Sequence, residues 1–486
     1  MTTYLWHDYE TWGVNPRRDR PAQFAAIRTD MDLNEVGQPL MLYCQPPMDA
    51  LPSPQACLIT GITPQLCAQK GLPEFEFAAQ VEAALGQPGT IGVGYNSIRF
   101  DDEVTRFMLW RNLRDAYARE WQHDCSRWDL LDVVRLAHAL RPDGIHWPTA
   151  AAEPGKPEKT PKPSFKLTDL TAANGIAHVG AHDALADVRA TIALARLLKM
   201  AQPKLFDFAL ALRKKDRVAA ELGLPASPQN AKPFLHVSGM FPPERGCLAL
   251  MWPLATHPSN KNEVLAWDLA HNPSQLANIS AAEIRERLFT KTEDLPEGVE
   301  RLPIKSVHLN KSPMVVGNLA TLTPAMAQRW GIDKDLALLH AAMARDLPDL
   351  SGIWPQVFTR EKNGPTDVDE DLYGGFLGNA DRRRLDGLRG LDGPALAKTK
   401  NAFDDARLEE MVFRYRARNW PQSLNTEEQT RWQDHVAARF FEGEGGATTV
   451  DAYCAEIDTL SETANDRAEE ILGALYDWAE VVVPER

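Results

Sequence analysis

LWHDYETWG, at residues 5–13, is the segment that most strongly indicates the fold class of this 486-residue chain. Apolar residues predict a strand over Tyr4–Tyr9. Asp8 and Glu10 stand two residues apart at its end, so strand alternation sends both carboxylates to one face of a sheet. Converging carboxylates suit Mg²⁺, which takes oxygen ligands. Because the pattern is short, a solvated polar strand edge is the alternative.

A second acidic segment is TIGVGYNSIRFDDEVTRFML, at residues 90–109. It predicts a strand over Thr90–Tyr95, then a loop, then a helix over Asp101–Arg111. Taken singly, Asp101 could merely cap that helix by accepting a backbone N–H.

A third segment is AHDALADVRATIALARLLKM, at residues 181–200, and it predicts a helix that begins at Asp183. Asp183 can serve as N-cap, which leaves His182 in the preceding loop and Asp187 about one turn into the helix. A lone histidine before a helix is most often a surface residue, so His182 gains interest only from its companions.

Composition and charge bound the function classes. Hydrophobic content of 44% and charged content of 25% are those of a soluble globular protein, and the length suggests about three domains. No targeting segment or long apolar run directs the chain out of the cytoplasm, where we expect it. Six scattered cysteines suggest neither a zinc site nor disulfides.

The net charge of −14 is awkward for a nucleic-acid partner, but its distribution matters more. From Phe441 to Arg486 there are 12 acidic residues against Arg467 and Arg486, which leaves −4 for the first 440 residues. A basic groove elsewhere in the chain is therefore permitted.

The chain divides into three regions. We expect an α/β domain over residues 1–200, a β-rich domain over residues 203–361 and a helical domain over residues 366–486. Within these regions, apolar spacing predicts helices over Trp128–Leu140 and Asn401–Arg418 and a strand over Glu263–Asp268, and Trp128 is interpreted as a core side chain. Within the first region, residues 149–164 (TAAAEPGKPEKTPKPS) are rich in Pro and Lys and are predicted to be a surface insertion of unassigned function.

The acidic segments together resemble a known superfamily. Asp8, Glu10, Asp101 and Asp187, with His182 before the last, reproduce the order and local context of the DEDD 3′→5′ exonucleases of the His type, a branch of the ribonuclease-H-like fold.

The resemblance narrows to bacterial exonuclease I. Segments similar to that family include HDYET (7–11), DRPAQFAAIRTD (19–30), RFDDEVTR (99–106), ANGIAH (173–178), AHDALADV (181–188), HVSGMF (236–241) and FRYRARNWP (413–421). The family architecture would be an exonuclease domain, a Src-homology-3-like β-barrel domain and a C-terminal helical domain. The implied activity is Mg²⁺-dependent release of 5′-mononucleotides from the 3′ end of single-stranded DNA, in DNA repair and recombination.

The resemblance also implies roles for the acidic set. Two Mg²⁺ ions, for which Mn²⁺ could substitute, would be held by Asp8, Glu10, Asp101 and Asp187, with Asp8 bridging them. His182 would accept a proton from the attacking water. Glu10 could also contact the terminal 3′-hydroxyl group.

Substrate and partner contacts follow from the same resemblance. Expected DNA contacts are Lys166, Arg106, Tyr117, Trp121, Arg135, Arg141, Lys215, Asn262, Lys305 and Asn310. Lys166 stands where the family typically carries Arg, so phosphate contact there would be looser. The expected protein partner is the C-terminal tail of single-stranded DNA-binding protein, with Arg141 and Lys232 as its site, and we expect a monomer.

Two other functions stay open. An exoribonuclease of the same superfamily is one, although such chains are usually a single short domain. A non-catalytic single-stranded DNA-binding scaffold is the other, and the intact carboxylate set argues against it.

Overall fold

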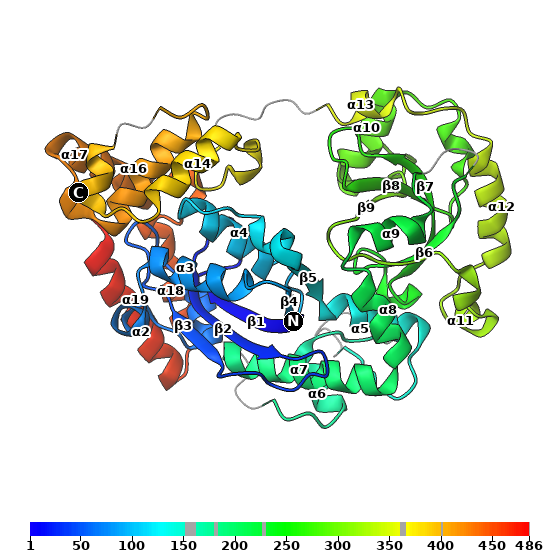
Figure 1. Ribbon diagram of the computed structural model, residues 1–486, viewed down its shortest axis with the longest axis horizontal. Helices are drawn as coiled ribbons and strands as arrows, with labels where there is room; N and C mark the ends of the chain where they lie inside the picture. The colour runs from blue at the N-terminus through cyan, green and yellow to red at the C-terminus, as the bar shows by residue number, and fades with distance from the viewer. Residues whose placement is uncertain (151–161, 179–182, 226–229, 360–365, 400–401, 486) are drawn as a thin grey trace. The chain divides into compact units, whose positions relative to one another are not determined.

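A computed structural model describes residues 1–150, 162–178, 183–225, 230–359, 366–399 and 402–485. The chain forms two compact units (Figure 1). The first comprises Met1–Ser126, His178–Arg189 and Asn363–Arg486, and the second Arg127–Ala177 and Ala190–Lys362. These units cut across the three predicted regions, because the C-terminal helices group with the N-terminal sheet. The three-domain division itself stays a prediction.

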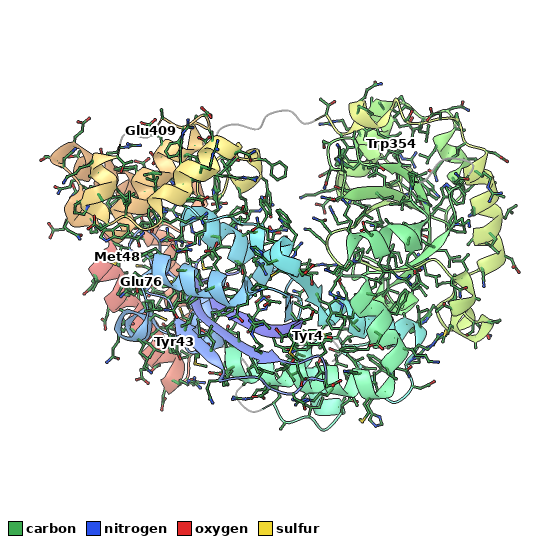
Figure 2. All side chains as sticks on the ribbon, viewed as in Figure 1. Tyr4, Tyr43, Met48, Glu76, Trp354 and Glu409 are labelled. Atoms are coloured by element: carbon green, nitrogen blue, oxygen red, sulfur yellow. The ribbon has the colours of Figure 1, made fainter. Side chains whose placement is uncertain are left out.

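A mixed sheet in the order β3-β2-β1-β4-β5 forms the base of the first unit. Its strands are β1 (Thr3–Thr11), β2 (Pro21–Thr29), β3 (Leu40–Tyr43), β4 (Thr90–Gly94) and β5 (Ser126–Asp129), the last of which begins where the chain leaves the first unit. β1 pairs antiparallel with β2 and parallel with β4. Tyr4 on β1, labelled in Figure 2, is fully buried. The strand that carries Asp8 and Glu10 is therefore held along both edges.

Two elements near this sheet differ from the prediction. β2 is missing from the predicted strands because nearly all of its residues are buried, so it lacks the alternation typical of a half-exposed strand. The helix predicted from Trp128 begins instead at Leu130, after Asp129 accepts the N–H of Leu131 at 3.0 Å. Trp128 itself lies in β5 and is fully buried, as expected for a core side chain.

The first unit also contains helices. They are α1 (Pro54–Thr60), α2 (Pro64–Lys70), α3 (Glu74–Leu85) and α4 (Asp101–Arg111), followed by α14 (Asn379–Leu388), α15 (Gly393–Lys398), α16 (Arg407–Asn419), α17 (Thr426–Ala437), α18 (Val450–Ser461) and α19 (Asp466–Val482). α4 has the predicted bounds, whereas the helix predicted from Asn401 begins at Arg407. Phe107 of α4 packs in one apolar cluster with Leu385 and Leu408, so the C-terminal helices share a core with α4.

Buried ion pairs reinforce this shared core. Asp49 has no exposed surface and accepts from Arg20 at 2.9 Å and from Arg418 of α16 at 3.0 Å. The backbone carbonyl of Asp49 also accepts from Arg439 at 2.8 Å. These guanidinium groups hold the pKa of Asp49 well below its usual range despite burial. The network ties the start of β2 to the C-terminal helices.

The second unit contains an antiparallel sheet in the order β10-β6-β7-β8-β9. Its strands are β6 (Phe234–Val237), β7 (Leu248–Thr256), β8 (Glu263–Asp268), β9 (Ile304–His308) and β10 (Met314–Val316). The helices are α5 (Leu130–Leu140), α6 (Leu167–Ala173), α7 (Ala184–Ala201), which begins in the first unit, α8 (Pro203–Ala211), α9 (Lys215–Leu222), α10 (Ala281–Phe289), α11 (Pro324–Arg329), α12 (Lys334–Arg345) and α13 (Trp354–Val357). The predicted β-rich region therefore also carries helices.

All six cysteines are free thiols. Among the described residues, no helix combines the length and the apolar character that crossing a membrane requires.

Candidate active site

The carboxylates of Asp8, Glu10 and Asp187 converge in the first unit. Each offers an oxygen atom that lies within 4.8 Å of the others. Asp8 and Glu10 come from β1, where they pair with Ala25 and Gln23 of β2. The structure therefore brings together three of the four predicted metal ligands as one group.

The first turn of α7 supplies Asp187. Asp183 caps this helix, as predicted, and accepts the N–H of Ala186 at 3.1 Å. The N–H of Ala184 donates to Gln23 Oε1 at 3.4 Å, and Gln23 is the β2 neighbour of Glu10. This contact places the start of α7 beside the end of β1.

Asp101, the fourth predicted ligand, is the first residue of α4 and is 3% exposed. Its Oδ1 accepts the backbone N–H of Tyr9 at 3.1 Å. The Tyr9 hydroxyl lies 3.0 Å from Thr105 Oγ1, which donates to the Asp101 carbonyl at 2.8 Å. Asp101 is thus bound to β1 at the residue after Asp8, and the N-cap position of α4 belongs to Phe100.

The cluster is electrostatically strained without a cation. Burial raises the pKa of Asp8 well above its usual range, and the charge of Asp101 beside it adds to this effect. Burial, together with the charges of Asp187 and Asp101, raises the pKa of Glu10 to about 8. Oxygen donors of this kind, crowded and partly buried, fit a hard divalent cation, which would relieve their mutual repulsion.

Metal-free protein should lose stability as the pH rises. The folded state keeps a proton on Glu10 up to about pH 8, whereas an unfolded chain releases it near the ordinary glutamate pKa of 4.5. Between these values the folded state binds more protons, so the free energy of unfolding falls with increasing pH. Each pKa unit is worth about 1.4 kcal/mol, so the loss should reach a few kcal/mol.

Thermal denaturation in EDTA across this pH range would measure the loss. Glu10→Gln is the matched control, because it removes the titrating group and should flatten the profile. Added divalent metal should stabilise the wild type more at the alkaline end. An equally steep profile in Glu10→Gln would contradict the assignment.

A histidine that the sequence analysis did not single out contacts this cluster. His178 Nε2 lies 2.5 Å from Asp187 Oδ1, and its side chain is 6% exposed. The only sequence signal was its place in the ANGIAH segment. The predicted proton acceptor, His182, lies outside the described residues.

The guanidinium group of Arg106 makes hydrogen bonds to other side chains of the protein. Arg106 is 4% exposed, and its guanidinium donates to Glu103 and Glu120 at 2.7 Å each and to the Tyr373 hydroxyl at 3.0 Å. It also lies 5.3 Å from the centre of the Tyr117 ring. Arg106 therefore holds Tyr117 and α4 in place.

Tyr117 lines a cavity of about 390 Å³ in the first unit. Phe376, which is 85% exposed, lies with its ring centre 6.1 Å from that of Tyr117. Arg114, Arg382 and Arg389 add positive charge to the same lining. Trp121, the other predicted aromatic, is 66% exposed a few residues further on.

Two predicted DNA contacts, Asn262 and Asn310, lie at one end of the second sheet, and a third, Lys305, lies further along it. Lys305 lies on the edge strand β9 and pairs with Ala266 of β8. Asn262 precedes β8, and its carbonyl accepts the N–H of Leu309, the residue before Asn310. This backbone hydrogen bond brings Asn262 and Asn310 close together, where β8 begins and β9 ends.

The remaining predicted contacts of the second unit are dispersed. Lys166 is the exposed N-cap residue of α6, and Lys215 is the exposed first residue of α9. Arg135 donates to Asp132 at 2.7 Å. The predicted partner site is divided: Arg141 lines a cavity of about 530 Å³ with Phe208, Lys204 and Arg217, while Lys232 is exposed and is not part of that lining.

Family models cover almost the entire chain. The model described as Exonuclease matches residues 5–195, the Exonuclease I SH3-like domain matches residues 213–360, and the Exonuclease I C-terminal domain matches residues 366–482.

Curated relatives match over their full length as well. Exodeoxyribonuclease I of Escherichia coli is 43% identical over 487 residues, covering 99% of this chain and 98% of that protein. Exodeoxyribonuclease I of Haemophilus influenzae is 44% identical, covering 98% of each chain.

Solved structures give the same result. An exonuclease I from Methylocaldum szegediense superimposes with a TM-score of 0.92 at 46% identity and covers 100% of both chains. E. coli exonuclease I in complex with a dA16 oligonucleotide gives a TM-score of 0.91 at 42% identity, covering 99% of this chain and 100% of that one. Further structures of similar likeness are a zinc-bound E. coli ExoI–ssDNA complex and an ExoI/SSB-Ct complex.

Proposed function

The chain belongs to the exonuclease I family, and from this premise we propose that it is a Mg²⁺-dependent exonuclease that removes mononucleotides from the 3′ end of single-stranded DNA. The observation that carries the proposal is the convergence of Asp8, Glu10 and Asp187 within 4.8 Å. This acidic group lies inside the part of the chain that matches the exonuclease model. The family uses divalent metal ions, and the choice of Mg²⁺ rests on the all-oxygen donor set.

In phosphodiester hydrolysis at this site, the carboxylates of the chain have the role of holding the metal ions. Bound divalent ions would supply an activated water and a stabiliser for the leaving 3′-oxygen. Asp8, Glu10 and Asp187 would hold them, and Asp101, fixed to the N–H of Tyr9, would complete the set. A water oxygen attacks phosphorus, the bond to the 3′-oxygen breaks, and the products are a 5′-mononucleotide and a shortened strand with a new 3′-hydroxyl group.

His182 is the proposed proton acceptor for the attacking water. An imidazole has an ordinary pKa near neutrality, which suits this role. The proton then passes to solvent, and the leaving 3′-oxygen takes up a proton in turn. Glu10 is the proposed contact for the terminal 3′-hydroxyl group, which would give the reaction its polarity.

The DNA strand would be held by cations and aromatic rings. In the first unit, we place a base against Tyr117 and Trp121, with Arg106 fixing Tyr117 from behind. In the second unit, the proposed contacts are Lys305 on β9 and the asparagines Asn262 and Asn310, which lie beyond the end of that strand. Arg135, Arg141, Lys166 and Lys215 are further proposed phosphate contacts.

Replacing Lys305 with alanine should weaken the hold on long strands without slowing the chemistry. Binding of single-stranded DNA falls with salt by a log–log slope of about −0.7 per phosphate neutralised, so the variant should show a shallower slope. It should also remove fewer nucleotides per encounter. Fluorescence anisotropy over a salt series and a trap assay for processivity would measure both effects.

The matched control for this variant is Lys291→Ala, because Lys291 is a lysine of the second unit that is 77% exposed and lies outside the proposed contacts. Cleavage of a very short oligonucleotide should be nearly unchanged in both variants. Equal impairment of Lys305→Ala on short and long strands would mean that this residue acts through folding, and the proposed clamp would be abandoned.

The proposed protein partner is the C-terminal tail of single-stranded DNA-binding protein. The ExoI/SSB-Ct complex supports this assignment at 42% identity. An acidic and apolar tail matches the cavity beside Arg141, where apolar Leu136, Leu140 and Phe208 meet cationic Lys204 and Arg217. Lys232 stays a proposed contact outside that cavity.

One assay tests the proposed function as a whole. Full-length protein with Mg²⁺ is given 5′-labelled or 3′-labelled single-stranded DNA, duplex DNA and RNA. A 3′ label should appear at once as mononucleotide, a 5′ label should shorten gradually, and EDTA should stop both. Equal degradation of RNA would favour an exoribonuclease, and binding without cleavage would favour a scaffold.

A further inference from the structure

His178 contacts a proposed metal ligand and has no role in the mechanism described so far. Its Nε2 atom lies 2.5 Å from Asp187 Oδ1, with the His178 and Asp187 side chains 6% and 21% exposed. A carboxylate that is ionised for metal binding can only accept hydrogen bonds, so Nε2 then carries the hydrogen in this contact. The imidazole is thus placed to donate to one ligand of the metal cluster.

We propose that His178 is a positioning residue that orients the Asp187 carboxylate for metal binding. The inference rests on the metal site proposed above. A donated hydrogen bond to Oδ1 fixes the rotation of the carboxylate and leaves its remaining oxygen lone pairs for a cation. Carboxylate ligands are commonly held in this way by a neighbouring donor, and loss of such a donor weakens metal affinity by about 10–100-fold.

The arrangement of the cluster explains why Asp187 needs such support. Asp8 and Glu10 are placed by β1, which is paired on both edges. Asp187 instead comes from the first turn of α7, and its side chain is less buried than Glu10. Fixing a side chain that retains rotational freedom costs entropy when the cation binds. His178 would remove that cost in advance, at the one ligand of the three that the sheet does not hold.

The test uses His178→Ala and His178→Gln in the full-length protein. Glutamine retains an N–H donor at a comparable reach, whereas alanine has none. Titration of Mn²⁺ into DNA-free protein, followed by calorimetry, should show about 10–100-fold weaker binding in His178→Ala. His178→Gln should bind within a few-fold of the wild type. His271→Ala, an exposed histidine of the second unit, controls for loss of an adventitious surface ligand.

Kinetics separate positioning from proton transfer. The rate of His178→Ala should recover toward the wild-type value as the metal concentration is raised, because the defect lies in metal affinity. His182→Ala should remain about 10²–10⁴-fold slower at every metal concentration, the range for a lost general base. Melting temperatures in EDTA identify any variant that is simply misfolded.

Defined results would overturn the inference. Unchanged Mn²⁺ affinity in His178→Ala would exclude a positioning role, and equal loss in His178→Gln and His178→Ala would exclude the hydrogen bond as its cause. A rate defect in His178→Ala that persists at saturating metal would make the histidine a participant in the chemistry. Failure of the wild type to bind Mn²⁺ would instead overturn the metal site itself, which distinguishes the two proposals.

Discussion

Replacing Asp8 with asparagine is expected to abolish cleavage and, at the same time, to raise the melting temperature of the metal-free protein. Asp8 is a half-buried carboxylate whose pKa is raised by desolvation and by the adjacent charge of Asp101. Asparagine has similar shape but no charge, so it relieves this repulsion. Metal ions contribute several kcal/mol to catalysis and each ~1.4 kcal/mol is tenfold, so the rate should fall by roughly 10³-fold or more.

Three measurements check this expectation: product release from labelled single-stranded DNA, thermal denaturation in EDTA, and anisotropy of a labelled oligonucleotide in EDTA. DNA binding should persist, because Asp8 is assigned to metal and not to DNA. Glu76→Gln is the matched control, because Glu76 is an exposed carboxylate on α3 (Figure 2). Its replacement removes one negative charge outside the cluster. Near-normal cleavage by Asp8→Asn would refute the site.

Replacing Asp49 with alanine is expected to lower the free energy of unfolding more than any other substitution proposed for this protein. The substitution removes the carboxylate that the buried Arg20 guanidinium contacts, whereas Arg418 keeps its contact with Asp369. Breaking a buried ion pair by removing one partner costs about 3–5 kcal/mol, because the remaining charge stays desolvated. The broken ion-pair network joins the start of β2 to the C-terminal helices. Because β1 pairs with β2, we expect β1 to be destabilised as well.

Urea denaturation followed by tryptophan fluorescence would measure this loss. Asp404→Ala is the matched control: Asp404 also pairs with an arginine, Arg384 at 3.3 Å, but its side chain is 73% exposed. Exposed pairs contribute little, so its midpoint should hardly move. Similar midpoints for both variants would contradict a structural role for the buried network.

Much of the fold follows from local patterns in the sequence. α4 begins at Asp101 as predicted, and β8 spans Glu263–Asp268 as predicted, because each carries a clear periodicity bounded by turn residues. Where the periodicity is absent, as in the almost wholly buried β2, the prediction misses the strand. At Trp128 an apolar run continues from strand into helix, so the boundary was placed two residues early.

For the candidate site too, local sequence predicts one part and the tertiary structure decides another. The spacing of two residues within one strand predicts that Asp8 and Glu10 share a face of the sheet. The resemblance to a known family is what grouped these two residues with Asp101 and Asp187. That Asp187 reaches the Asp8 and Glu10 carboxylates depends on where α7 begins against the sheet, through Gln23 and Ala184.

The sequence by itself determined the α/β class of the first region, the spacing of the strand carboxylates and the family, because strand alternation, helix periodicity and residue order are properties of the chain. Only the tertiary structure decided that His178 Nε2 lies against Asp187 Oδ1 and that Arg106 donates to Glu103 and Glu120. It also decided that Asp49 meets Arg418, 369 positions away. Such partners are chosen by the packing of separate elements, and no local pattern encodes the distance between two side chains that the fold brings together.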